Sequence, residues 1–199
     1  MTDNGGNSEN TQKGGIPHTQ NLPLREGKGS CYEGGVRVPL MFCWPGKGKT
    51  GKCKTPVICE DLFPTILHMA GVTRYETVQE VDGVDLVPMI TGSGEGPSYD
   101  RPLIFHYPHK WKPYHNKDID FMSAIRMGDW KLLYRISTGE LELYNLIEDI
   151  GETSNVAAQY PEIVKLLAET LSEKIKLWDS PMPVVIDTGE KAPLPSQLL

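Results

Sequence analysis

Two short segments near the start of the chain carry side chains suited to binding ions. Asp3-Asn4-Gly5-Gly6 offers a carboxylate and an amide oxygen, which are ligands for hard cations such as Ca²⁺ or Mg²⁺. In Gly27-Lys28-Gly29-Ser30 a flexible backbone could present the ammonium of Lys28 to a bound anion. Each segment also has an ordinary interpretation when taken alone, because Asn-Gly is a common turn and a surface lysine is usually solvated.

Composition and spacing exclude several classes of function. The lysine motif is not a P-loop, because Glu26-Gly27-Lys28-Gly29 lacks the earlier glycine of G-x-x-x-x-G-K-[S/T]. The 199 residues carry a net charge of −6 with no dominant basic stripe, which argues against a nucleic-acid partner. No apolar run is long enough to span a membrane, and the first residues lack the features of a signal peptide. The compartment is left open.

The four cysteines do not follow a metal-binding pattern. Cys31, Cys43, Cys53 and Cys59 form no C-x-x-C pair, and their spacings match no zinc motif. Free buried thiols are one interpretation, and one disulfide in an exported protein is the other.

The elements that must position these residues begin with an irregular stretch over residues 3–35 that is rich in Gly, Asn, Ser and Thr. Val36–Trp44 is predicted to be a mostly buried strand interrupted by Pro39. Glu60–Ala70 is predicted to be a helix, because its apolar residues recur at helical spacing. The Gly/Pro/Ser-rich residues 92–100 indicate a domain boundary.

Beyond this boundary the pattern predicts a small antiparallel sheet. Its strands are expected at Pro102–Tyr107, Met122–Arg126, Trp130–Arg135 and Leu141–Tyr144, with tight turns between the later ones. A final helix is predicted at residues 161–178 and is expected to cover one side of the sheet. Its apolar face would consist of Ile163, Leu166, Leu167, Leu171, Ile175 and Trp178. The proline-rich tail after Ser180 is expected to run extended.

Taken together and in order, these motifs closely resemble the formylglycine-dependent sulfatase family. The resemblance runs from Asp3 to about Trp178. Besides the two segments described first, it rests on Tyr32-Glu33-Gly34-Gly35-Val36-Arg37-Val38-Pro39, Glu60-Asp61-Leu62-Phe63-Pro64-Thr65-Ile66-Leu67, Arg101-Pro102-Leu103-Ile104-Phe105-His106-Tyr107-Pro108-His109, Gly128-Asp129-Trp130-Lys131-Leu132 and Glu142-Leu143-Tyr144-Asn145-Leu146.

The resemblance implies a role for particular residues. Asp3 and Asn4 match the family's pair of ligands to a divalent metal, usually calcium, and Lys28 matches the lysine that contacts the sulfate or the leaving oxygen. Fixed cations at that oxygen would stabilise the charge that develops on it. His106 and His109 match a stretch near the substrate mouth of carbohydrate sulfatases, so they are candidate substrate-binding residues. The alternative for each is a structural histidine of the sheet.

The chain departs from the family at the nucleophile. The C/S-x-P-x-R motif that is oxidised to formylglycine is absent, and Cys43-Trp44-Pro45-Gly46-Lys47 ends in lysine instead of arginine. The resemblance therefore implies the C-terminal portion of a sulfatase, whose substrate would be a sulfated carbohydrate or an aryl sulfate. The His106-Tyr107-Pro108-His109 stretch favours the carbohydrate. Alone, the chain is predicted to be inactive and to bind calcium weakly at best, because two ligands do not complete a six- to eight-coordinate site.

The expected fold class is an α+β fragment of the α/β, alkaline-phosphatase-like sulfatase fold. Residues 1–95 would form the C-terminal edge of the large domain, residues 96–180 a small antiparallel subdomain with its helix, and residues 181–199 an extended tail. Two alternatives stay open: a phosphohydrolase of the same superfamily, and a non-catalytic binding or assembly module. A face exposed by truncation would promote self-association.

Overall fold

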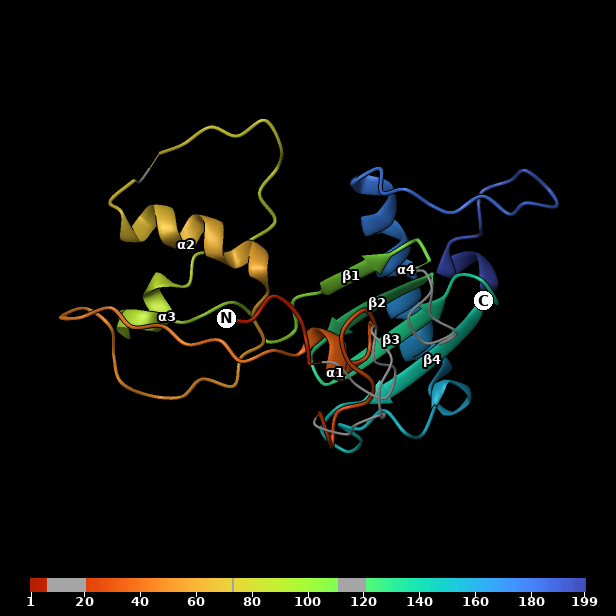
Figure 1. The fold of residues 1–199 in the computed structure, drawn as a ribbon, viewed down its shortest axis with the longest axis horizontal. Coiled ribbons are helices and arrows are strands. Elements are labelled where there is room, and N and C mark those ends of the chain that lie inside the picture. Colours follow the sequence, from red (N-terminus) through yellow and green to blue (C-terminus); the bar gives the residue numbers. More distant parts are fainter. Residues whose placement is uncertain (7–20, 73, 111–120) are drawn as a thin grey trace. The chain divides into compact units, whose positions relative to one another are not determined.

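A computed structural model describes residues 1–6, 21–72, 74–110 and 121–199 of the chain (Figure 1). The chain forms two compact units. The first unit combines Met1–Pro39 with Pro102–Leu199, and the second consists of Leu40–Arg101. Each unit is described by itself.

The first unit is built on a four-stranded antiparallel sheet in the order β1-β2-β3-β4. The strands are β1 Leu103–Tyr107, β2 Met122–Met127, β3 Trp130–Arg135 and β4 Glu140–Asn145. Ala124 of β2 lies opposite Leu133 of β3, which lies opposite Glu142 of β4. The predicted strands and their antiparallel arrangement are confirmed.

Helix α4 (Pro161–Leu177) covers one face of this sheet, as expected. Its buried stripe consists of Val164, Leu167, Ala168, Leu171, Ser172 and Ile175. These residues pack against Ile125, Leu132, Tyr134 and Leu143 of the strands. The prediction was wrong for Leu166, whose side chain is 51% exposed. The stripe is centred on Leu167, Leu171 and Ile175, so Leu166 falls outside it.

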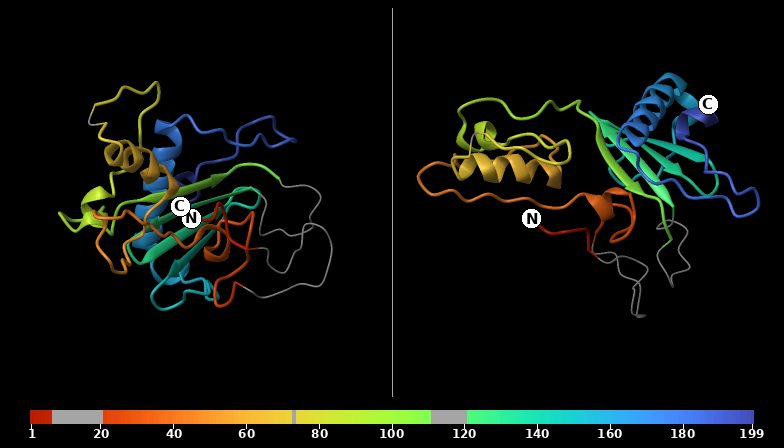
Figure 2. Two further views of the ribbon diagram at one scale, coloured as in Figure 1. Left: turned by 60° about the vertical axis from the view of Figure 1, so that its left-hand side comes forward. Right: turned by 90° about the horizontal axis from the view of Figure 1, so that it is seen from above.

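Residues 21–39, which include the short helix α1 (Glu33–Val36), lie on the opposite face of the sheet. Figure 2 (right) shows this segment in orange on one side of the strands and α4 in blue on the other. Cys31 and Tyr32 pack there against Met122, Ala124, Leu133, Tyr144 and Leu146. Successive side chains of a strand point to opposite faces, so the sheet is buried on both sides.

The second unit contains a 3-10 turn η1 (Cys59–Asp61), helix α2 (Leu62–Met69) and helix α3 (Val87–Thr91). The helix predicted over residues 60–70 is thereby confirmed. Asp61 is fully buried and forms an ion pair with Arg101. Its carboxylate also accepts hydrogen bonds from the backbone N–H groups of Ile58 and Val84, both at 2.9 Å.

The strand predicted at Val36–Trp44 is wrong. Val36 ends α1, and none of residues 37–44 is in a strand. A strand must pair its backbone groups with a neighbour, and Pro39 has no N–H to offer. A run of apolar residues such as Val38-Pro39-Leu40-Met41-Phe42 does not reveal whether a pairing partner is present.

The tail, which was expected to run extended, is folded back in part. A bridge joins Val184 and Lys191, and a 3-10 turn η4 covers Pro195–Leu198. The four cysteines are free, with only Cys31 buried, so neither a disulfide nor four buried thiols is observed. No helix in the described part of the chain is long and apolar enough to cross a membrane.

Candidate functional site

The structure brings the two predicted ion-binding segments together. The N–H of Gly5 donates to the carbonyl of Gly35 at 2.9 Å, and the N–H of Lys28 donates to the carbonyl of Gly6 at 3.0 Å. Asn21 strengthens this contact, since its Nδ2 donates to the carbonyls of Gly6 at 2.8 Å and Glu26 at 2.9 Å. The Asp-Asn segment therefore lies against the loop that carries Lys28.

Close backbone approach explains why glycine is needed at this crossing. A Cβ atom on Gly5 would lie 1.7 Å from the carbonyl oxygen of Gly34. A Cβ atom on Gly34 would lie 2.3 Å from the carbonyl oxygen of Arg25. Both distances are far inside van der Waals contact, so a side chain at either position would push the two segments apart.

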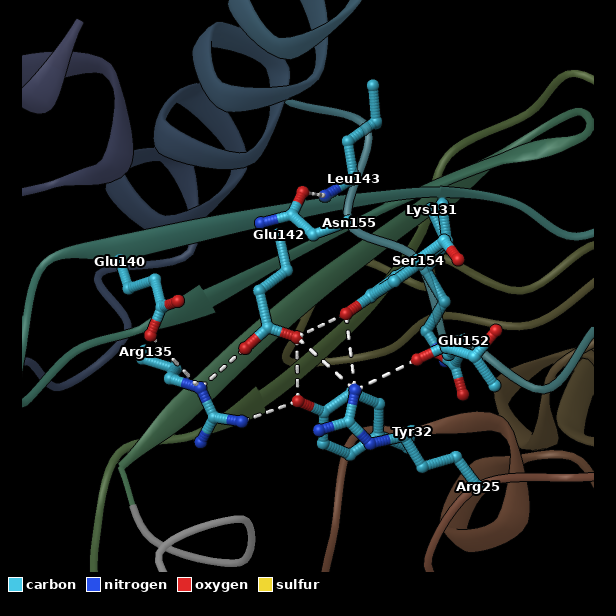
Figure 3. A network of polar contacts seen from close by, with 12 residues as sticks. Arg25, Tyr32, Lys131, Arg135, Glu140, Glu142, Leu143, Glu152, Ser154 and Asn155 are labelled. Atoms are coloured by element: carbon cyan, nitrogen blue, oxygen red, sulfur yellow. Dashed lines mark hydrogen bonds and ion pairs between the residues drawn. The ribbon is translucent and has the colours of Figure 1, made fainter. Parts of the chain in front are cut away.

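The segment that carries Lys28, here called the Lys28 loop (residues 25–35), is attached to the sheet through Tyr32. The Tyr32 hydroxyl donates to Glu142 Oε2 at 2.7 Å and accepts from Arg135 Nη2 at 2.5 Å (Figure 3). Glu142 also accepts from the Tyr144 hydroxyl at 2.7 Å and from Arg135 Nε at 2.5 Å. Burial and the hydrogen bond to Glu142 raise the pKa of Tyr32, so its hydroxyl stays protonated.

Arg25 holds the start of the Lys28 loop. Its guanidinium lies 4.0 Å from the centroid of the Tyr32 ring, a cation–π contact. Its Nη1 donates to the carbonyl of Glu152 at 2.9 Å and to the hydroxyl of Tyr144 at 3.2 Å. Both ends of the Tyr32 side chain, ring and hydroxyl, are therefore fixed by cations.

A second buried group of charges lies beside the first. The Nζ of Lys131 is 2.9 Å from Glu33 Oε1 and 2.9 Å from Glu152 Oε1. All three residues are at most 2% exposed. Glu33 also lies 3.4 Å from Arg37 and 3.7 Å from Arg126. Three cations thus surround one of the two carboxylates that share Lys131.

The pKa values of the two carboxyl groups, Glu33 and Glu152, are shifted in opposite directions. Burial opposes ionisation of Glu33, but Lys131, Arg126 and Arg37 outweigh it and lower its pKa. Burial dominates at Glu152 and raises its pKa despite Lys131. Burial also opposes the charge of Lys131, yet Glu152 and Glu33 raise its pKa overall.

The candidate metal ligands match the chemistry of a hard cation but not the number that it needs. Asp3 is exposed and Asn4 is half-buried, and each offers one oxygen-bearing side chain. Among the described residues, no group of three or more His, Cys, Asp or Glu side chains could hold a metal. These two residues therefore fit part of a calcium coordination sphere.

The structure does not bring His106 to the Lys28 loop. Its Nε2 lies 2.8 Å from the carbonyl of Pro181 and its Nδ1 2.7 Å from Ser123 Oγ, on the face of the sheet covered by α4. A carbonyl only accepts, so Nε2 carries the proton. Burial lowers the pKa of His106. These contacts are those of a structural histidine, and its role in substrate binding stays a prediction.

His109 lies differently. Its ring is 3.9 Å from the ring of Tyr107, centroid to centroid. Tyr107 packs against the cluster that contains Cys31 and Tyr32, on the same face of the sheet as the Lys28 loop. Its role in substrate binding also stays a prediction.

The sequence motifs include Lys131 and Glu142, but the sequence analysis assigned no role to them, and Glu152 lies outside those motifs. A signal existed for the first, because Lys131, Leu133 and Arg135 occupy alternate positions of β3 and so share one face. Two cations flanking an apolar residue on a core-facing side indicate buried carboxylate partners. Glu152 lies in a turn, where no periodic pattern marks it.

Comparison with known proteins identifies the family. Residues 27–177 match the family model described as N-sulphoglucosamine sulphohydrolase, C-terminal. A "Sulfatase" from Formosa agariphila is 33% identical over 189 residues, covering 90% of this chain and 34% of the relative. The chain belongs to the sulfatase family. It spans about a third of the length of that curated sulfatase.

Solved structures agree with this assignment and with the alkaline-phosphatase-like fold expected for a sulfatase. The structure of Ps i-CgsB in complex with k-i-k-neocarrahexaose matches with a TM-score of 0.65 and 29% identity. That match covers 90% of this chain and 36% of the other. BT4656 in complex with its substrate D-glucosamine-2-N,6-O-disulfate matches with a TM-score of 0.50 and 28% identity, over 65% of this chain and 25% of the other.

Proposed function

We propose that this chain is the C-terminal portion of a sulfatase that hydrolyses sulfate esters of carbohydrates. In this proposal Lys28 contacts the sulfate, and Asp3 and Asn4 supply part of a calcium site. The observation that carries it is the pair of backbone hydrogen bonds, Gly5 to Gly35 and Lys28 to Gly6, which join the segments that bear these residues.

The chemistry follows from charge. In the hydrolysis of a sulfate ester, negative charge grows on the leaving oxygen, and a fixed ammonium stabilises that charge more in the transition state than in the ground state. Bound calcium would supply further positive charge at the sulfate oxygens. Lys28 is half-buried within a loop attached near both ends, which limits how far the backbone that carries its ammonium can move.

A sulfated carbohydrate as the substrate is supported by the similarity to BT4656, whose structure holds a disulfated glucosamine. His109 is the better placed of the two candidate substrate-binding histidines, because its ring lies on the face that carries the Lys28 loop.

The first test is the DNA directly upstream of the Met1 codon. An open reading frame that encodes a C/S-x-P-x-R motif supports the proposal. Stop codons that close the frame, with no such motif nearby, contradict it. For the chain alone we expect no turnover of an aryl sulfate and at most millimolar calcium affinity. Measurable turnover by the purified chain would refute the prediction that the chain, which lacks the C/S-x-P-x-R motif, is inactive alone.

The second test addresses Lys28 directly. Inorganic sulfate is titrated into the chain while amide chemical shifts of residues 27–30 are followed by NMR. Removing the lysine charge in Lys28→Ala is expected to weaken sulfate binding about tenfold, which corresponds to about 1.4 kcal/mol. Lys47→Ala, which removes an exposed lysine of the other unit, is the control and should leave binding unchanged. Equal binding by Lys28→Ala and the unaltered chain would contradict the proposed role.

A further inference from the structure

We propose that Glu152 is a positioning residue that holds both ends of the Lys28 loop. The inference rests on the proposed function only in that Lys28 is taken as the residue being positioned. Glu152 follows β4 and is separated from the Lys28 loop by more than a hundred residues of sequence. It lies in none of the motifs that carry the family resemblance.

The first two contacts come from different parts of Glu152. Its backbone carbonyl accepts from Arg25 Nη1 at 2.9 Å, at the start of the loop. Its carboxylate Oε2 accepts from the backbone N–H of Glu33 at 2.7 Å, near the end of the loop. Lys28 lies between Arg25 and Glu33 in the sequence, so Glu152 contacts the loop on both sides of Lys28.

A third contact ties Glu152 to the sheet. Its Oε1 lies 2.9 Å from Nζ of Lys131, on β3, one of the two inner strands. Glu152 and Lys131 are both fully buried. An ion pair excluded from water is screened little, so it fixes the carboxylate more firmly than a surface pair would. The loop is thereby attached to the sheet through Glu152 and Lys131.

The backbone of Glu152 is held in an uncommon conformation. Its φ is 52°, in the left-handed region that side chains other than glycine, asparagine and aspartate rarely adopt. Asp149 stabilises the turn around it, accepting from the N–H groups of Thr153 at 2.8 Å and Ser154 at 2.9 Å. In this conformation the carbonyl and the carboxylate of one residue reach Arg25 and Glu33 at the two ends of the loop.

The other anchor of the loop acts elsewhere. Tyr32 is fixed through Glu142 and Arg135, and the start of the loop is held by the contacts of Arg25 and by the bond of Lys28 to Gly6. The Glu152 carboxylate holds the end of the loop at Glu33. Removing the Glu152 side chain removes its contacts to Glu33 and Lys131 but leaves the carbonyl that Arg25 contacts. It should therefore loosen the loop from its end near Glu33 while the sheet stays intact.

The test compares Glu152→Ala and Glu152→Gln in the full chain by amide hydrogen exchange. Glu152→Ala removes the acceptor for Glu33 N–H and the charge that faces Lys131. Glu152→Gln keeps a carboxamide oxygen for that N–H and should partly restore protection. We expect exchange in residues 27–34 to rise about tenfold or more in the alanine variant and less in the glutamine variant. Glu148→Gln, at an exposed position of the preceding turn, is the matched control.

Strand amides separate a positioning role from general stabilisation. The inference requires that protection in β3 and α4 change far less than protection in the loop. Equal loss throughout the unit, or unchanged exchange in residues 27–34, would overturn it. Should the alanine variant fail to fold, the glutamine variant and its control decide the question.

A second readout links Glu152 to the anion. Glu152→Ala should weaken the sulfate-induced NMR shifts of residues 27–30, and Glu152→Gln should recover part of them. If Lys28→Ala leaves these shifts unchanged, the role of Lys28 fails, while the exchange data still decide whether Glu152 holds the loop.

Discussion

Replacing Lys131 by methionine is expected to destabilise the first unit strongly at neutral pH. Lys131 is fully buried between Glu33 and Glu152, each 2.9 Å away. Removing one partner of a buried ion pair costs about 3–5 kcal/mol, because the remaining charge is left in a medium of low dielectric. Glu33 would keep Arg37 and Arg126, so the main penalty falls on Glu152. We therefore expect a loss near the lower end of that range, about 3 kcal/mol.

The loss should depend on pH with a definite sign. Burial already raises the folded-state pKa of Glu152, and removing Lys131 raises it further. A carboxyl group with a raised folded-state pKa contributes stability below its unfolded pKa and loses that contribution as pH rises through the folded pKa. The penalty in Lys131→Met should therefore be smaller at pH 5 than at pH 8.

Urea unfolding followed by far-UV circular dichroism measures this effect, because the sheet and α4 supply most of the regular structure. Lys165→Met is the matched control, since it makes the same substitution at an exposed position of α4. The control should stay within about 0.5 kcal/mol of the unaltered chain. A loss below about 1 kcal/mol for Lys131→Met at pH 8, or an equal loss at both pH values, would refute the reasoning.

Three further outcomes are expected. Tyr32→Phe should cost about 1–3 kcal/mol in the same urea titration, because Glu142 loses a buried donor and Arg135 a buried acceptor; a change below about 0.5 kcal/mol would contradict the account of this anchor. In the native chain a thiol reagent should modify Cys43, Cys53 and Cys59 but not Cys31, whose pKa burial raises to about 12, until the unit unfolds; four equally fast thiols would disprove the packing of Cys31. Burial would raise the pKa of Glu142, but hydrogen bonds from Tyr144, Tyr32 and Arg135 lower it below its usual 4.5, so its contribution to stability should be lost as pH falls below that value; a melting temperature that does not decline on acidification below pH 4.5 argues against it.

The sequence was sufficient for the elements whose patterns are local. The strands of residues 102–145 are short and rich in apolar residues, tight turns join the later ones, and neighbours in sequence pair with each other. Helix α4 carries its own periodicity, and only its outer edge at Leu166 was misassigned. In both cases the information lies within the segment itself.

The errors and omissions concern contacts between distant residues. Val36–Trp44 has the composition of a strand, but strand formation depends on a partner that composition does not reveal. Glu33 and Glu152 are far apart in the chain, and only the fold shows that one lysine joins them. The pairing of Asp3-Asn4 with Lys28 came from resemblance, whereas the hydrogen bonds that join their segments came from the structure.

The motif that identifies the family contains residues with two different tasks. Lys28 is the residue with chemistry to perform, whereas Tyr32 and Glu33 are buried anchors whose partners lie on β3, β4 and the turn after β4. Side chains alternate along a strand, so a shift of β3 by one residue would send Lys131 and Arg135 to the face covered by α4. Both anchors of the Lys28 loop would then lose a partner at once, Glu33 the ammonium of Lys131 and Tyr32 the guanidinium of Arg135. The position of Lys28 therefore depends on the register of a sheet that contributes none of the residues proposed to contact the sulfate.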